Sequence, residues 1–155
     1  MGPPPGLAVR LATPADAGVI ADFNLRLARE SEGLELDPPT VAAGVAALLA
    51  DEAKGLYLLA EEAGEPVGQL MLTVEWSDWR NGPIYWLQSV YVRGERRGGG
   101  VFRALWDRAV ELARERGGRA IRLYVDRDNV GAQQVYRRVG MAPSHYLVYE
   151  REPLE

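Results

Sequence analysis

Cysteine is absent from this sequence of 155 residues, and histidine occurs once, as His145. The lack of cysteine excludes disulfide bonds, thiolate nucleophiles and zinc sites with thiolate ligands, and nothing in it points to an oxidising compartment. We therefore expect a cytoplasmic location. A single histidine excludes histidine-based metal clusters and argues against a Ser-His-Asp triad.

Long hydrophobic runs are missing as well. The longest, VAAGVAALLA from Val41 to Ala50, is far too short to span a bilayer, and the first residues do not resemble a signal peptide. The formal net charge of -4 argues against a general affinity for nucleic acid or anionic membranes. The length suits a single domain, which we place at residues 7–155 after a proline-rich, disordered tail at residues 1–6.

The remaining pattern alternates between strand and helix periods. Strands are expected at residues 7–12, 56–62, 66–76, 84–92, 120–125 and 144–151. Helices are expected from Thr13 to about 30, after Asp37 to about 51, from 101 to about 116 and from Asn129 to 140. The expected fold class is α/β (α+β), with a mixed, mostly antiparallel central sheet of about six to seven strands flanked by about four helices.

Positive charge is concentrated in VRGERRGGGVFRAL (92–105), where four arginines surround three consecutive glycines. The helix expected after Gly100 has no Ser, Thr, Asp or Asn before it to cap its first N–H groups. Glycines allow a sharp turn and the close approach of a bulky anion, and the helix dipole adds roughly half a positive charge there. Arg96, Arg97 and Arg103 would add charge-assisted hydrogen bonds. The loop is interpreted as a pyrophosphate cradle; the alternative is a solvated, flexible loop.

Three kinds of phosphate loop compete for this interpretation. A Walker loop is excluded, because Gly-Lys-Ser/Thr would have to stand where the chain has Val101-Phe102-Arg103. A dinucleotide fingerprint would need a third glycine at the position of Arg103, and the preceding antiparallel strands do not suit a doubly wound sheet. Coenzyme A is the third option.

Two motifs in the right order and spacing favour coenzyme A. The segments SVYVRGERRGGGVFRALWDRAVELARERG and IRLYVDRDNVGAQQVYRRVGM closely resemble the GNAT superfamily of acyl-CoA-dependent N-acyltransferases. The first contains residues 97–102, to be compared with the family pattern Gln/Arg-x-x-Gly-x-Gly/Ala, and the second contains Asn129, Ala132, Tyr136 and Gly140-Met141. The strong resemblance covers roughly residues 84–141 and implies a GNAT-like fold.

The resemblance implies that acetyl-CoA is the cosubstrate and that no metal is needed. In relatives the loop N–H groups hold the CoA pyrophosphate, the strand matching Val90 to Val92 offers its backbone to the pantetheine arm, and the residue matching Tyr136 is the general acid for the departing thiolate. The implied cofactor-binding residues are Val90, Tyr91, Val92, Arg97, Gly98, Gly99, Gly100, Val101, Phe102, Arg103, Asn129, Ala132 and Tyr136.

Two positions depart from the family pattern. Phe102 replaces the small residue that ends the loop, and we expect its ring to turn into the core with Trp106. Gln88 stands where a number of relatives have a glutamate base, and an amide cannot usefully accept the proton of an amine. Glu75 or Asp78 is the possible base, with Glu32 and Glu35 as further candidates.

The amine acceptor is expected beside a cluster of aromatic and acidic side chains, because these suit a cationic amine. The alternative is that the rings pin a hairpin or a subunit interface. The proposed acceptor-site residues are Glu32, Glu35, Trp76, Asp78, Trp79, Trp86 and Gln88. The function implied is acetyl-CoA-dependent N-acetyl transfer to a primary amine of a small molecule or peptide by direct attack, with a catalytically weak acyl-CoA sensor as the alternative. The resemblance also makes a homodimer plausible.

Overall fold

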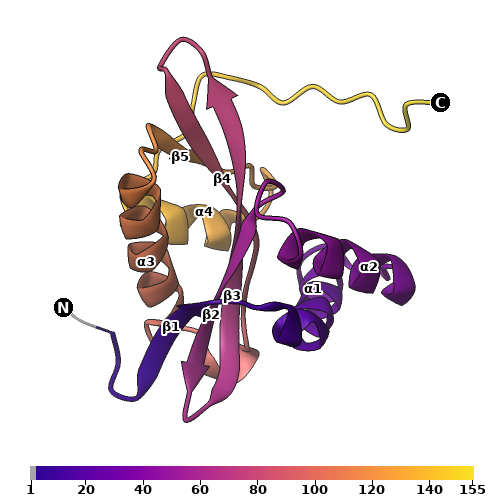
Figure 1. Ribbon diagram of the computed structural model, residues 1–155, viewed down its shortest axis with the longest axis vertical. Coiled ribbons are helices and arrows are strands. Elements are labelled where there is room, and N and C mark those ends of the chain that lie inside the picture. The colour runs from indigo at the N-terminus through magenta and orange to yellow at the C-terminus, as the bar shows by residue number, and fades with distance from the viewer. Residues whose placement is uncertain (1–2) are drawn as a thin grey trace. The chain divides into compact units, whose positions relative to one another are not determined.

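The computed structural model describes residues 3–155, so residues 1 and 2 of the expected tail lie outside the described residues. The chain divides into two units, Met1–Leu123 and Tyr124–Glu155, and each is described by itself. The first unit contains a five-stranded sheet in the order β1-β2-β3-β4-β5 (Figure 1).

The strands are β1 (Leu7–Leu11), β2 (Leu56–Glu62), β3 (Glu65–Ser77), β4 (Gly82–Val92) and β5 (Ala120–Arg122). The first four pair antiparallel in sequence order, as expected of a meander, and β5 pairs parallel with β4. The parallel pairing requires a crossover between β4 and β5, and the glycine loop and the helix after it provide that crossover.

Helices cover both faces of this sheet (Figure 1). α1 (Ala17–Glu32), which follows the short 3-10 helix η1 (Pro14–Asp16), and α2 (Pro38–Leu49) lie on one face, and α3 (Val101–Glu115) lies on the other. A second 3-10 helix, η2 (Gly94–Arg96), precedes α3, and α4 (Val130–Arg138) belongs to the second unit. α2 follows Asp37 as expected, and the Asp37 carboxylate caps it by accepting a hydrogen bond from the Thr40 N–H.

Buried apolar side chains hold the two helical layers on the sheet. Ile20 of α1 and Val45 of α2 pack with Tyr57 and Leu59 of β2 on one face. The α3 face is packed by a second set of buried residues, Val101, Leu105, Ala109 and Leu112. At roughly 25 cal/mol per Å² of apolar surface, such burial is the main term that stabilises each layer.

The fold class is confirmed, but the expected number of strands was too high. The described residues form five strands rather than six or seven, and the strand expected at 144–151 is wrong, because no strand forms there. The expected strand at 120–125 is also shorter, Ala120–Arg122. Tyr146, Leu147, Val148 and Tyr149 are strand-forming residues that are 60–89% exposed. Strand propensity reflects packing on a half-buried pleated surface, and among residues 3–155 no strand pairs with this segment.

Candidate functional site

The glycine loop connects β4 to α3 through a left-handed backbone. Gly98 and Gly100 have φ values of +80° and +87°, a region that favours glycine. Gly100 is the N-cap of α3 and no side chain caps that helix. The first N–H groups of α3 therefore lack an intrahelical partner and a capping side chain, which is the arrangement that binds anions at helix N-termini.

Three glycines around the loop leave little room for a side chain. A Cβ on Gly100 would lie 3.2 Å from Pro4 Cγ, and one on Gly99 would lie 3.2 Å from the Arg96 carbonyl. On β3, a Cβ at Gly68 would lie 2.8 Å from Val101 Cγ1. The bare backbone of Gly68 thus lets the first turn of α3 sit close to the sheet.

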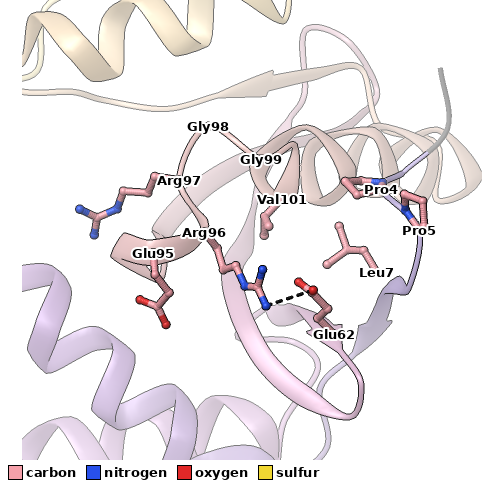
Figure 2. Close-up of a pocket in the computed structure, with 10 residues that line it drawn as sticks. All are labelled: Pro4, Pro5, Leu7, Glu62, Glu95, Arg96, Arg97, Gly98, Gly99 and Val101. Carbon is pink, nitrogen blue, oxygen red and sulfur yellow. Dashed lines mark ion pairs between the residues drawn. The ribbon is translucent and has the colours of Figure 1, made fainter.

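A pocket of about 270 Å³ lies beside the loop (Figure 2). The N-terminal segment forms one wall, and the Leu7 N–H donates to the Pro4 carbonyl at 3.1 Å. The pocket is lined by Pro4, Pro5, Leu7, Glu62, Glu95, Arg96, Arg97, Gly98, Gly99 and Val101. A pocket that joins loop backbone to arginine side chains is suited to a phosphorylated group.

The arginines of the loop are paired with acids of the same chain. Arg96 lies 3.0 Å from Glu62, and Arg103 lies 3.1 Å from Asp107. Figure 2 shows the Arg97 side chain directed away from Pro4 and Pro5. Its Nη2 pairs with Glu30 of α1, and its Nε donates to the Val92 carbonyl at 2.9 Å. The attraction for an anion therefore rests first on backbone N–H groups and the helix dipole.

Glu30 was not foreseen from the sequence, because it is 67 residues from Arg97. The Tyr91 hydroxyl donates to its Oε2 at 2.7 Å, and this bond together with Arg97 lowers the pKa of Glu30. Burial, followed by the bond to Glu30, raises the pKa of the Tyr91 hydroxyl. A neutral Tyr91 and an ionised Glu30 thus join α1, the end of β4 and the loop.

β4 has a bulge just before the loop. Opposite β3, Gln69 pairs with Tyr91 and Met71 pairs with Gln88, so β4 contains one residue more than β3 between these pairs. Ser89 in the bulge has φ of +49°, an uncommon value for a residue with a side chain. The bulge interrupts the regular ladder beside Val90, at the segment expected to face the pantetheine arm.

Polar side chains gather on one face of the sheet further along β3 and β4. Trp86 Nε1 donates to Glu75 Oε1 at 3.0 Å, and Arg122 of β5 lies 3.6 Å from Glu75 Oε2. Gln88 Nε2 donates to Thr73 Oγ1 at 2.7 Å. Two of the proposed acceptor-site residues, Trp86 and Gln88, and the possible base Glu75 thereby lie on one face of two neighbouring strands.

The other proposed acceptor residues lie on exposed segments. Trp76 and Trp79 are 63% and 88% exposed, and the Asp78 carboxylate accepts a hydrogen bond from the Trp79 N–H. Glu32 ends α1, and Glu35 pairs with Arg29 at 2.9 Å. The structure therefore does not gather the two tryptophans and the two glutamates into one enclosed pocket within the described residues.

Phe102 packs as expected against Trp106, a buried residue one turn further along α3. Their ring centroids are 6.4 Å apart, and the ring planes are inclined by 29°. The large side chain at the end of the loop is thus accommodated by stacking along the helix.

The second unit holds the remaining motif residues. Asn129 caps α4, because its Oδ1 accepts from the Ala132 N–H at 3.1 Å. Burial raises the pKa of the Tyr136 hydroxyl on the same helix. Tyr136 consequently keeps its proton at neutral pH, as a general acid must.

Among residues 3–155, no helix is long and apolar enough to cross a membrane. The same residues contain no group of three or more histidine and acidic side chains able to hold a metal ion.

Comparison with known proteins shows where this combination of fold and loop occurs. The family model described as Acetyltransferase (GNAT) family matches residues 23–141. The solved structure of a possible acetyltransferase from Clostridium difficile 630 is 40% identical, has a TM-score of 0.90 and is matched over 96% of this chain and 99% of that chain.

Two curated proteins extend the comparison. The aminoglycoside N(6')-acetyltransferase type 1 of Stenotrophomonas maltophilia is 30% identical over 151 residues, which cover 95% of this chain and 94% of that protein. An uncharacterized N-acetyltransferase of Methanocaldococcus jannaschii is 32% identical over 85 residues, 54% of this chain but only 38% of that protein.

The fold, the glycine loop and these matches define an N-acetyltransferase. The chain belongs to the acetyltransferase (GNAT) family. Enzymes of this family use acetyl-CoA and acylate amines.

Proposed function

We propose that this protein transfers the acetyl group of acetyl-CoA to a primary amine of a small molecule or peptide by direct attack of the amine on the thioester. The observation that carries the proposal is the uncapped N-terminus of α3, which follows three glycines and a bulged strand. Family membership supports the choice of acetyl-CoA over other anions.

The residues around the loop fit a diphosphate. The left-handed backbone at Gly98 and Gly100 turns the chain into α3, whose first N–H groups we propose as the anion site. A side chain at Gly100 would crowd Pro4. We assign the pyrophosphate to the backbone of residues 97–103 and the pantetheine arm to that of Val90 to Val92. Acetyl-CoA supplies the activated acetyl thioester when it is bound.

Proton transfer is assigned to two further side chains. Tyr136, with its raised pKa, donates the proton that the departing thiolate needs. For the base we favour Glu75 over Asp78, because Glu75 shares a sheet face with Gln88 and contacts Trp86. An ordered carboxylate on a strand positions a proton acceptor better than one in an exposed turn.

The proposed acceptor site lies beside the turn between β3 and β4. Trp79 and Asp78 offer an exposed ring and a carboxylate to a cationic amine. The relative from Stenotrophomonas maltophilia is an aminoglycoside acetyltransferase, so aminoglycosides belong in the first panel of acceptors. Trp79→Ala and Asp78→Asn are expected to raise the acceptor KM several-fold and to leave the acetyl-CoA KM unchanged. An unchanged acceptor KM for every active amine would remove this site from the proposal.

The deciding experiment measures binding and turnover separately. Calorimetry with acetyl-CoA, CoA and NAD should show binding of the first two only. Release of the CoA thiol is then followed with aminoglycosides, polyamines and peptides as acceptors, and at least one amine should give turnover. Binding without turnover for any amine would favour the acyl-CoA sensor, and binding of NAD alone would refute the assignment of the loop.

A homodimer is part of the proposal. Tyr146, Leu147, Val148 and Tyr149 form an exposed apolar run, and their contacts in two copies would bury an area of the order of 1,000 Å², the lower limit for a specific interface. We expect Tyr149→Asp to shift light-scattering mass toward the monomer. A wild-type chain that is monomeric at micromolar concentration would contradict it. The proposed location is the cytoplasm, which the cysteine-free sequence suits.

A further inference from the structure

Gln69 is a fully buried amide in the middle of β3, with 0% of its surface exposed. It lies between α1 and β4, and the reaction assigned above does not use it. Burying an amide costs free energy unless it is hydrogen-bonded, so each of its polar atoms requires an explanation.

The amide nitrogen makes two hydrogen bonds. Nε2 donates to Asn24 Oδ1 of α1 at 2.8 Å and to the Ser89 carbonyl of β4 at 3.1 Å. Asn24 Nδ2 in turn donates to the Tyr57 hydroxyl at 3.1 Å. Because both neighbours of Nε2 are acceptors, only the NH2 group of Gln69 can face them, and the orientation of the amide is determined.

The amide oxygen has no hydrogen-bond partner among the described residues. A methionine would fill nearly the same volume without burying this oxygen, and packing alone would favour it. The presence of an amide at this position is therefore explained by the two hydrogen bonds that its NH2 group donates. One of them binds the backbone of β4 at the Ser89 carbonyl.

Ser89 is the residue that needs such a donor. It lies in the β4 bulge, where the strand pairing shifts, and its φ of +49° is unfavourable for any residue other than glycine. A bulge leaves the extra residue outside the ladder, so the Ser89 carbonyl loses a regular backbone partner. Gln69 replaces that partner from the neighbouring strand.

We propose that Gln69 is a positioning residue for acetyl-CoA, which holds the β4 bulge in the conformation that leaves the backbone of Val90 to Val92 open to the pantetheine arm. The inference rests on the proposed function, since it assumes that this backbone receives the cosubstrate. Gln69 acts through Ser89 and has no assigned contact with the reacting atoms.

The test replaces Gln69 by methionine, which keeps the length and removes the donors. Of the two hydrogen bonds removed, loss of the one to Ser89 should weaken acetyl-CoA binding by about tenfold. The acetyl-CoA Kd and KM should rise, whereas the acceptor KM should stay constant. Tyr57→Phe is the matched control: it removes a hydroxyl from the same network but leaves the bond between Gln69 and Ser89, so the acetyl-CoA Kd should not change.

A second variant separates positioning from stability. Ser89→Gly, combined with Gln69→Met, makes φ near +49° acceptable without a donor, because glycine populates this region freely. The double variant should recover most of the acetyl-CoA affinity while its Tm remains below that of the wild type. A residue needed only for core packing would show no such recovery.

The outcomes distinguish this inference from the proposed function. A wild-type protein that binds acetyl-CoA and a Gln69→Met variant that binds it equally well would overturn the positioning role alone. Weakened binding that Ser89→Gly does not restore would also overturn it. A wild-type protein with no affinity for acetyl-CoA would overturn the proposed function together with this inference.

Discussion

Gly68 offers the sharpest test of how the sheet positions α3, the helix whose N-terminus is proposed to bind the anion. It pairs with Val92 at the end of β4 and lies beneath the first turn of α3. In Gly68→Ala the new Cβ would lie 2.8 Å from Val101 Cγ1, 3.1 Å from the Tyr91 carbonyl and 3.4 Å from Leu105 Cδ1. Since carbon atoms in contact prefer about 3.5–4.0 Å, Val101 has to move by about 1 Å.

The cost follows from the packing around Val101, which is 4% exposed. Overpacking a buried site costs about 1–3 kcal/mol, and the stiffer unfolded chain of the alanine variant offsets about 0.4–1 kcal/mol of this. A net loss of about 1–2 kcal/mol lowers the Tm by about 2–8 °C in a domain of this size. Displacement of the first N–H groups of α3 should raise the acetyl-CoA Kd by about tenfold.

Thermal unfolding and calorimetric titration with acetyl-CoA measure the two effects. Gly44→Ala is the matched control, because Gly44 lies within α2 and the new Cβ would meet no atom within 4 Å beyond the neighbouring backbone of that helix. That variant should be more stable by about 0.5–1 kcal/mol with an unchanged Kd. Adding Val101→Ala to Gly68→Ala removes the closest contact and should restore affinity without restoring stability. If Gly68→Ala lowers the Tm but leaves the Kd unchanged, the start of α3 does not determine binding, and the reasoning is refuted.

Two further predictions concern titrating side chains. Tyr136→Phe should lower kcat by about 10²-fold or more with a nearly constant acetyl-CoA KM, because only proton donation is lost, whereas the exposed control Tyr149→Phe should have no effect on either. Since burial raises the pKa of Tyr136, loss of its proton should reduce activity only above pH 10. A decline of activity below pH 10 would mean that another group titrates. The Arg10 guanidinium lowers the pKa of Asp16 from 3.8 to about 2, so the pair stabilises the fold above about pH 4 and this contribution is lost as pH falls toward 2. Asp16→Asn should therefore cost at most about 2 kcal/mol at pH 7, because Arg10 is 40% exposed and partly screened, and the difference from wild type in urea unfolding should disappear near pH 2.

Sequence signals predicted those elements whose ends are determined by nearby residues. α2 was predicted as a helix that follows Asp37 and the two prolines after it, and α3 was predicted from its apolar spacing. The strand expected at 144–151 was wrong because a strand needs a partner surface, which local propensity does not reveal. Local sequence patterns therefore predict elements whose ends depend on nearby residues but not pairings between distant segments.

The same limit applies to the site. Gly98 and Gly100 were recognised because glycines before a helix are visible in the sequence. The left-handed residue in β4 was not, since Ser89 has nothing in its neighbourhood that predicts a positive φ. Gln69 has the pattern of an ordinary strand residue, and its proposed role depends on the Ser89 carbonyl, which is 20 residues away.

The pairing of the loop arginines changes what these residues can contribute to binding. Arg97 already has Glu30 and the Val92 carbonyl as partners, so contact with a phosphate would have to replace a charge-assisted bond rather than add one. The net gain from such an exchange is smaller than that from N–H groups that have no protein partner to lose. We therefore expect the anion affinity of this loop to depend on its backbone more than on its charge, so that an acidic chain with paired arginines can still bind the proposed diphosphate.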